Sequence, residues 1–162
     1  MKHFLFALFM FFAMAASAQV VGYTHKALSA KGCVMKYSVV KQDSSYYIIA
    51  NVISDRMSFL PESTMKIRTF NDEVITLKGA AIVNGGQSVG IISGNIVIPV
   101  TAISSTAQFS ITPEELEMLN NGVSKVRLTM TPTEHEHTFK KDKIGKKLYK
   151  FYLKVKTGND NF

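Results

Sequence analysis

The alternating acids and histidines of residues 134–137, Glu-His-Glu-His, are the strongest sign of chemistry in this sequence. Successive side chains of a strand point to opposite faces, so an extended chain would place His135 and His137 on one side, at a spacing suited to a metal ion. Zinc needs at least three protein ligands, and the other donors, Asp142 and the distant His25, are not fixed by the sequence. His135 and His137 are therefore the metal candidates. An exposed strand end or loop also explains the pattern, and we expect no metal or other cofactor.

Nucleophilic and acid–base catalysis have less support. Cys33 is the single cysteine, so it cannot form an intrachain disulfide, and its alternating surroundings suggest a half-buried structural thiol. The sequence has no Gly-x-Ser-x-Gly turn for a nucleophilic serine, and the glycines of residues 84–94 lack the spacing of a phosphate-binding loop. The acidic residues lie at expected turns, at a helix start or beside lysines, where carboxylates are usually solvated or capping. We therefore expect no catalytic residues.

Positive charge is concentrated near the C-terminus. Residues 140–156 contain eight lysines and one aspartate, a net charge of +7, whereas the other residues after position 18 sum to −1. Proteins that bind nucleic acid usually add arginine and exposed aromatic side chains to such a segment, and no arginine follows Arg127. We expect no nucleic-acid partner. Lys147, Lys150 and Lys154 are the candidate ligand-binding residues, for an anionic lipid, an acidic glycan or an acidic protein, unless this face is simply solvated.

Residues 1–18 have the three parts of a secretory signal peptide. Lys2 and His3 precede an apolar run, and Ala16-Ser17-Ala18 supplies the small residues that signal peptidase requires. The run is too short to cross a hydrocarbon core of about 30 Å as a helix. We expect cleavage between Ala18 and Gln19, a secreted or periplasmic mature chain and no transmembrane span. The mature 144 residues carry 18 basic and 12 acidic side chains, an ordinary composition for one domain covering residues 19–162.

The purified mature protein should therefore begin at Gln19 and carry no lipid. Although Gly32-Cys33 resembles the end of a lipid-attachment sequence, the polar residues just upstream, among them Thr24, His25 and Lys26, are unsuited to enter a membrane. Intact-mass measurement checks both points, because it reports the N-terminal residue and any added acyl chain together. A mass showing an acylated Cys33 would overturn both the cleavage site and the structural role of the thiol.

The elements that must position these residues are mainly strands, because apolar and polar side chains alternate with a period of two. Residues 33–54 and 65–77 predict two hairpins, with turns at residues 42–45 and at Asn71-Asp72. The glycine-rich residues 79–95 predict short strands and a wide loop.

Further strands are expected on both sides of a short helix. Residues 96–111 alternate as one long strand or two, with Pro99 at an edge or a bulge, and residues 123–130 alternate with an uncertain register. Between them, Thr112-Pro113-Glu114-Glu115 has the N-cap, the first-turn proline and the capping glutamate of a helix start. Gly122 suits the end of that helix.

The C-terminal residues 142–156 fit both a helix and a strand. As a strand, aromatic and aliphatic residues alternate with lysines. As a helix, the apolar residues share one face and the lysines the opposite one, and Asp142 can cap it. We predict the helix, because this pattern accounts for more of the residues, the lysines included. Its apolar face comprises Ile144, Leu148, Phe151, Tyr152 and Val155.

We therefore predict one mainly β domain, an antiparallel β-sandwich of about seven to nine strands. The short helix Pro113–Asn121 caps it, and the C-terminal amphipathic helix packs alongside. The expected core consists of inward-facing apolar residues: Tyr37, Ile48, Val52, Ile67, Leu77, Ile98, Leu116, Leu119, Val126, Leu128 and Phe151.

Four parts of the sequence also carry a likeness to known proteins. They are the signal peptide, residues 46–54, the pattern MKIRTFNDEVITL of residues 65–77, and residues 111–116 running into residues 122–128. Together they resemble small exported proteins that are common in Bacteroidetes, most of which have no assigned function. The resemblance covers most of the mature chain. It implies a β-rich fold and an envelope location, and it assigns no site residue.

Export, a β-rich pattern and the lack of a catalytic motif favour a non-enzymatic binding or interaction module of the bacterial envelope, with an envelope protein or a glycan as partner. The alternative is a metal-dependent or other hydrolase that uses His135 and His137. An enzyme needs polar groups that converge in a concave pocket. A binding module needs an exposed patch that suits its partner.

Overall fold

The computed structural model describes residues 19–26, 32–93 and 96–158, and for residues 87–93 and 96–101 it describes the backbone alone. The predicted signal peptide, residues 1–18, lies outside the described residues. Within the described part, no helix is both long enough and apolar enough to span a bilayer.

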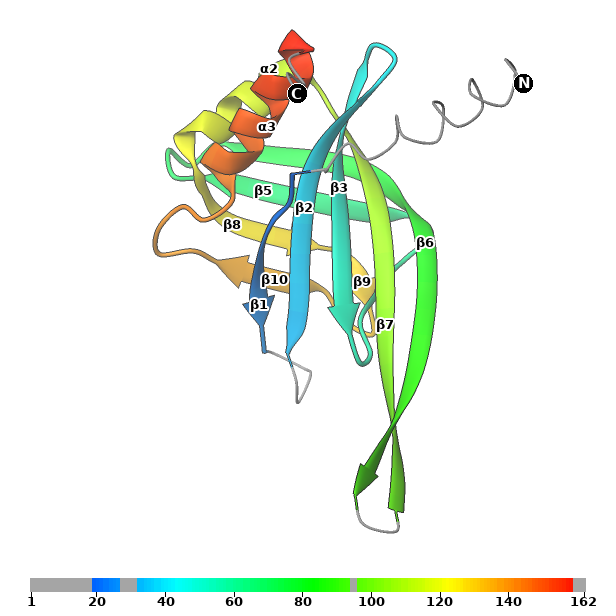
Figure 1. The fold of residues 1–162 in the computed structure, drawn as a ribbon. Coiled ribbons are helices and arrows are strands. Elements are labelled where there is room, and N and C mark those ends of the chain that lie inside the picture. Colours follow the sequence, from blue (N-terminus) through cyan, green and yellow to red (C-terminus); the bar gives the residue numbers. More distant parts are fainter. Residues whose placement is uncertain (1–18, 27–31, 94–95, 159–162) are drawn as a thin grey trace, which may run out of the picture.

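The described chain is mainly β, with two helices near its C-terminal end (Figure 1). In chain order the elements are β1 (Val21–His25), β2 (Cys33–Gln42), β3 (Ser45–Ser54), β4 (Ser58–Phe59), β5 (Ser63–Thr69), β6 (Val74–Ser93), β7 (Ile96–Ile111), α2 (Pro113–Met118), a 3-10 turn (Leu119–Asn121), β8 (Val123–Leu128), β9 (Met130–Thr131), β10 (His135–Thr138) and α3 (Gly145–Thr157).

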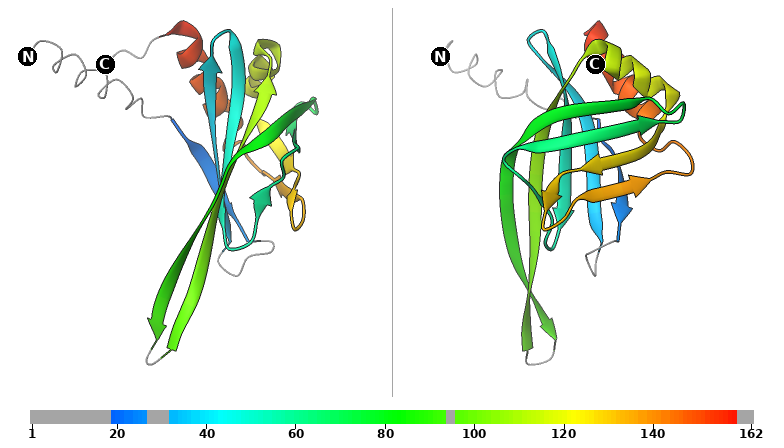
Figure 2. Two further views of the ribbon diagram at one scale, coloured as in Figure 1. Left: turned by 90° about the vertical axis from the view of Figure 1, so that its right-hand side faces the viewer. Right: turned by 180° about the vertical axis from the view of Figure 1, so that it is seen from behind.

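Eight strands form one antiparallel sheet in the order β1-β2-β3-β7-β6-β5-β8-β10, and β4 pairs with β9 in a small second sheet. The prediction of a mainly antiparallel β fold is confirmed, whereas its sandwich arrangement is not. The large sheet curls so far that β1 and β10, its two edge strands, face each other (Figures 1 and 2). Register shifts between Arg68 and Thr69 and between Ala81 and Val83 contribute to this curl, because bulges bend and twist a strand.

Both predicted hairpins are confirmed. β2 pairs with β3 from Val34↔Ile53 to Gln42↔Ser45, and β5 pairs with the first part of β6. Their turns contain Asp43 and Asp72, whose φ angles are 55° and 67°. Aspartate tolerates this left-handed region better than most residues, which explains why the turns occur where the sequence indicated them.

The prediction of short strands and a wide loop for residues 79–95 is wrong for residues 79–93, and residues 94–95 lie outside the described part. β6 is a single 20-residue strand, and β7 is one strand of 16 residues. Gly79 is required by close packing, since a Cβ there would lie 2.2 Å from the backbone oxygen of Gln108. The glycine thus permits tight strand pairing rather than a loop. Pro99 lies at an edge as expected, because its strand pairs there only with β6, opposite Gly90.

Both predicted helices are present. Thr112 and Glu115 form the reciprocal capping box of α2, and Gly122 follows the 3-10 turn with a φ of 74°. α3 begins at Gly145, three residues after Asp142, whose carboxylate accepts hydrogen bonds from the backbone N–H groups of Val123, Gly145 and Lys146 at 2.8–3.0 Å. Burial by itself would raise the pKa of the Asp142 carboxyl group. The hydrogen bonds together have the larger effect, so that pKa is lowered.

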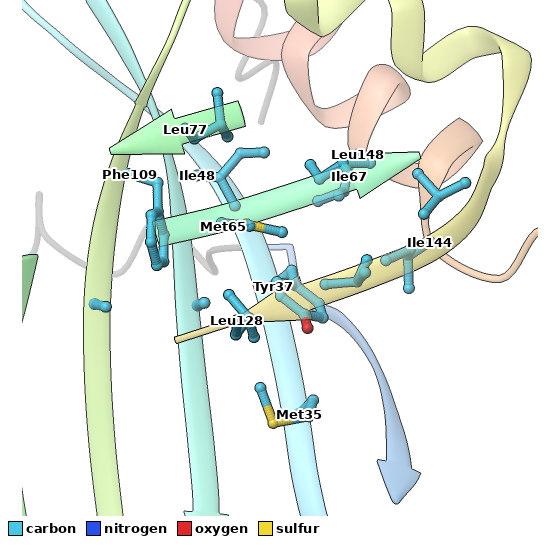
Figure 3. Packing of buried hydrophobic residues seen from close by; sticks show 14 of the residues in the cluster. Met35, Tyr37, Ile48, Met65, Ile67, Leu77, Phe109, Leu128, Ile144 and Leu148 are labelled. Atoms are coloured by element: carbon cyan, nitrogen blue, oxygen red, sulfur yellow. The ribbon is translucent and has the colours of Figure 1, made fainter. Parts of the chain in front are cut away.

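The core lies inside the curled sheet and under α3 (Figure 3). Nearly all of the predicted core residues are buried. Phe151 is a correction, because it is only partly buried, and the side chain of Ile98 lies outside the described part. The face that α3 presents to the sheet is made by Leu148 and Tyr152 together with Ile144, the residue just before the helix, and all three are fully buried.

Candidate functional site

The histidine and cysteine side chains that the sequence analysis considered for chemistry lie together, with three aromatic side chains, where β1 and β10 face each other. They come from three strands and from the residue after β10. We call this group the seam cluster: Tyr23, His25, Cys33, Tyr37, His135, His137 and Phe139.

Strand register and alternation place these side chains on one face. His25 is paired with Cys33 between β1 and β2, and Tyr23 lies two residues before His25 on the same face. In β10, His135 and His137 are likewise two residues apart, opposite Leu128 and Val126 of β8. The curl of the sheet then brings the two edges into contact, with the rings of His25 and His135 4.7 Å apart.

A chain of hydrogen bonds runs from the core to this seam. The hydroxyls of Tyr37 and Tyr23 share a hydrogen bond of 2.9 Å, and the Tyr23 hydroxyl lies 2.8 Å from Nε2 of His135. Nδ1 of His25 and Nδ1 of His137 lie 3.2 Å apart, and Sγ of Cys33 lies 3.9 Å from Nδ1 of His135. Both ring nitrogens of His135 thus have a polar neighbour, so this buried imidazole is satisfied within the cluster.

Burial favours the uncharged forms of His135, His137, Cys33 and Tyr23. His135 is only 2% exposed, and burial, together with repulsion by His25 and His137, lowers the pKa of His135 to about 4. The pKa of His137 is also lowered, mainly by burial. Burial raises the pKa of the Cys33 thiol and that of the Tyr23 hydroxyl. At neutral pH the buried side chains of His135, Cys33 and Tyr23 are therefore uncharged.

The two metal candidates, His135 and His137, are closer to a third histidine than the sequence suggested, because the fold brings His25 beside them. Even so, no three histidine, cysteine or acidic side chains within the described residues are arranged to hold a metal ion. Glu136 points to the other side, where its carboxylate pairs with Lys125 at 2.7 Å and with Arg127 at 2.6 Å. The interpretation of residues 134–137 as an exposed strand end is wrong for His135, which is buried.

The geometry does not favour a Cys–His nucleophile. The thiolate is the reactive form of cysteine, and burial of Cys33 raises its pKa, which disfavours that form. His135, its nearest imidazole, is also enclosed. A substrate would have no access to the sulfur without opening the seam. The seam cluster is thus better suited to holding the two sheet edges together than to catalysis.

The three lysine candidates lie on the solvent side of α3. Lys147, Lys150 and Lys154 are all exposed, and their spacing of three and four residues places them in one row along the helix. At 1.5 Å per residue the row is about 10 Å long. In the described part of the chain, no carboxylate forms an ion pair with any of the three; on this helix such a pair is made by Lys156 with Glu117, at 3.4 Å.

A pocket of about 300 Å³ lies near the β2–β3 turn and the start of α2. It is lined by Ser44, Ser45, Tyr46, Tyr47, Ser110, Ile111, Thr112 and Pro113. No histidine, cysteine, acidic or basic side chain lines it, so the pocket lacks the groups that acid–base or nucleophilic chemistry requires.

Sequence reasoning did not include Tyr23 in the site and set His25 aside as too distant, since 112 residues separate each of them from its partner in β10. The alternation of Val21, Tyr23 and His25 could have indicated a strand there. It would not have revealed that this strand lies beside β10. Comparison with known proteins adds no assignment, because no family model, no curated protein and no solved structure matches this chain.

Proposed function

We propose that this protein is an exported, non-enzymatic binding module that uses the lysine row of α3 to hold a linear acidic polysaccharide. The observation that carries the proposal is the orientation of α3. The apolar side of this helix packs in the core. The opposite side presents Lys147, Lys150 and Lys154 to solvent, and none of them has a carboxylate partner among the described residues. A lysine ammonium without a partner is free to pair with an external anion.

The charge distribution supports an extended partner. Residues 140–156 carry a net charge of +7, while the remainder of the mature chain is close to neutral. A row of charges with regular spacing suits a polymer whose own anionic groups repeat along a line, because several weak contacts then form together. Each exposed pair contributes little alone, so affinity depends on the number of lysines in the row.

Other anionic partners fit this surface less well. A helix that binds a membrane surface usually inserts an apolar face, and here Ile144, Leu148 and Tyr152 are buried against the sheet. Single-stranded nucleic acid is usually held by stacking on exposed aromatic rings, whereas the Tyr152 ring is enclosed and Phe151 is partly buried. The hydrolase alternative has no comparable support, since His135 lies inside the seam cluster.

Binding of the mature chain to heparin, used as the acidic polysaccharide probe, tests the proposal. The triple variant Lys147→Gln, Lys150→Gln, Lys154→Gln should bind at least about tenfold more weakly at low salt, because three charge contacts are lost. Affinity of the parent should also fall steeply as the salt concentration rises. Calorimetric or fluorescence titration at several salt concentrations measures both effects.

The matched control removes three exposed lysines from the outer face of the sheet, as Lys36→Gln, Lys66→Gln, Lys78→Gln. It lowers the net charge equally and should keep most of the heparin affinity. Equal weakening in the two triple variants would show a general charge effect and contradict a specific row. Parent protein that binds anionic lipid vesicles but not heparin would contradict the choice of partner.

A further inference from the structure

The pocket of about 300 Å³ lies where the β2–β3 turn meets the junction of β7 with α2. These segments lie at the same end of the molecule as the C-terminal part of α3 (Figure 1). The volume is at the lower end of the range for small-molecule sites. The pocket therefore suits one small ring rather than a long segment of a polymer.

The walls of the pocket are held by regular structure. Between β3 and β7, Tyr46 pairs with Ile111 and Tyr47 pairs with Ser110. The Tyr46 ring also contacts the Tyr152 ring of α3 edge-on, with 5.3 Å between the ring centroids, and the capping box holds the start of α2. Walls that are already ordered lose little conformational freedom when a ligand enters, so less of the interaction energy is spent on ordering them.

All of the polar side chains that line the pocket end in hydroxyl groups. The hydroxyl of Thr112 takes part in the capping box. Four others have no hydrogen-bond partner within the part of the chain that the structure describes, namely those of Ser44, Ser45, Tyr47 and Ser110. Each hydroxyl can both donate and accept, so a ligand that itself carries several hydroxyl groups can use both capacities.

Tyr47 adds an aromatic surface to these hydroxyls. Its side chain is half-buried and lies on the outer face of the sheet, beside the exposed Ser110 of the neighbouring strand. A tyrosine ring combines apolar faces with one polar tip. A sugar ring has a matching combination, because its C–H groups form apolar faces and its hydroxyls surround the edge. The lining therefore favours a carbohydrate over a purely apolar ligand, which would leave the hydroxyls unpaired.

The surroundings of the pocket favour an uncharged ligand. No acidic or basic side chain lines it, so a charged group of the ligand would gain no ion pair there. Asp43 and Glu114 directly adjoin the lining residues Ser44 and Pro113 in the chain. Two nearby carboxylates disfavour an anion further.

We propose that this pocket binds one neutral sugar ring, a pyranoside whose hydroxyl groups bond to the free serine hydroxyls and whose apolar face packs against Tyr47. The site is distinct from the lysine row of α3, which calls for an acidic ligand. Either site can therefore fail in an experiment while the other is upheld.

Amide NMR of the mature chain tests the proposal, with methyl β-D-glucopyranoside, methyl β-D-galactopyranoside and methyl α-D-mannopyranoside as probes. At least one of them should bind with a Kd on the order of 1–10 mM, as expected for a small ligand in an open pocket. The shift changes should be concentrated in residues 44–47 and 110–113. Absence of shift changes with all three probes at about 50 mM would overturn the proposal.

The variant Ser110→Phe places a ring in the pocket and should weaken binding of the best probe at least about tenfold. The matched control is Gln108→Phe, which makes the same addition two residues away on the same face of β7, outside the lining. It should leave the Kd within about threefold of the parent value. Equal weakening in the two variants would contradict the proposed location, and circular dichroism with the melting temperature shows whether both keep the fold.

A charged analogue and the lysine variant separate this site from the lysine row. For the best probe, the uronide with a carboxylate in place of the hydroxymethyl group should bind the pocket at least about threefold more weakly. The triple variant Lys147→Gln, Lys150→Gln, Lys154→Gln should bind the neutral probe as the parent does. Tighter binding of the uronide at the pocket would contradict a neutral ligand. Shift changes centred on α3, lost in the triple variant, would contradict the pocket as the site.

Discussion

Replacing Leu148 by alanine should lower the free energy of unfolding by about 2–5 kcal/mol. Leu148 is fully buried between α3 and the sheet, where Tyr37, Ile67 and Leu128 also contribute to the core (Figure 3). The substitution removes apolar contacts and leaves a cavity that the surrounding strands can fill only in part. Because small domains are stable by only about 5–15 kcal/mol, the loss should be evident in the urea midpoint of the mature chain.

Leu153→Ala is the matched control for this prediction. It makes the same chemical change on the same helix, but at a side chain that is 38% exposed. We expect an effect within about 0.5 kcal/mol, as for most surface substitutions. Phe151→Ala should lie between the two, because Phe151 is only partly buried. Equal midpoints for Leu148→Ala and Leu153→Ala would mean that α3 does not dock on the sheet in solution.

Acidification should destabilise the fold through His135. In the unfolded chain this histidine takes up its proton near the ordinary pKa of 6.5, whereas in the folded chain its pKa is lowered to about 4. Between these two pH values the unfolded state binds more protons, so the free energy of unfolding falls as the pH decreases. The contribution of the uncharged His135 to the free energy of unfolding is fully present above about pH 6.5 and is lost by about pH 4. At 1.36 kcal/mol per pH unit it amounts to about 3 kcal/mol.

The groups around His135 all favour this direction. Tyr23 and Cys33 are uncharged at neutral pH, since burial raises both of their pKa values. His25 and His137 would repel an added proton, and the charge of Lys143 acts on His137 in the same sense. No carboxylate of β10 offsets this, because Glu136 is paired with Lys125 and Arg127 on the other face.

The experiment compares urea unfolding of the parent and of His135→Gln at a series of pH values from 7.5 to 3.5. Titrating groups outside the seam cluster, among them Asp142 with its lowered pKa, act equally in both proteins and cancel in the difference. The difference in unfolding free energy should therefore change by about 3 kcal/mol across this range. A constant difference would mean that His135 is accessible to protons in the folded state. His135→Asn, which has a shorter side chain, separates the loss of titration from a change in packing.

The parts of the fold that were predictable from sequence are those set by residues close together in the chain. The hairpin turns at Asp43 and Asp72 follow from backbone preferences of single residues. The start of α2 follows from the capping residues Thr112 and Glu115, three positions apart. The helical nature of α3 follows from the spacing of its apolar and lysine residues, because burial of one face selects the period of 3.6.

The order of the strands, and with it the candidate sites, depended on contacts between distant residues. Whether residues 79–93 formed a loop or a strand was decided by pairing with β7, which no local pattern of glycines reveals. The closeness of His25 to His137 arises from the curl of the whole sheet, which brings its first and last strands together. Burial and neighbouring histidines then set the charge state of His135, because a pKa depends on the three-dimensional surroundings rather than on the adjacent residues.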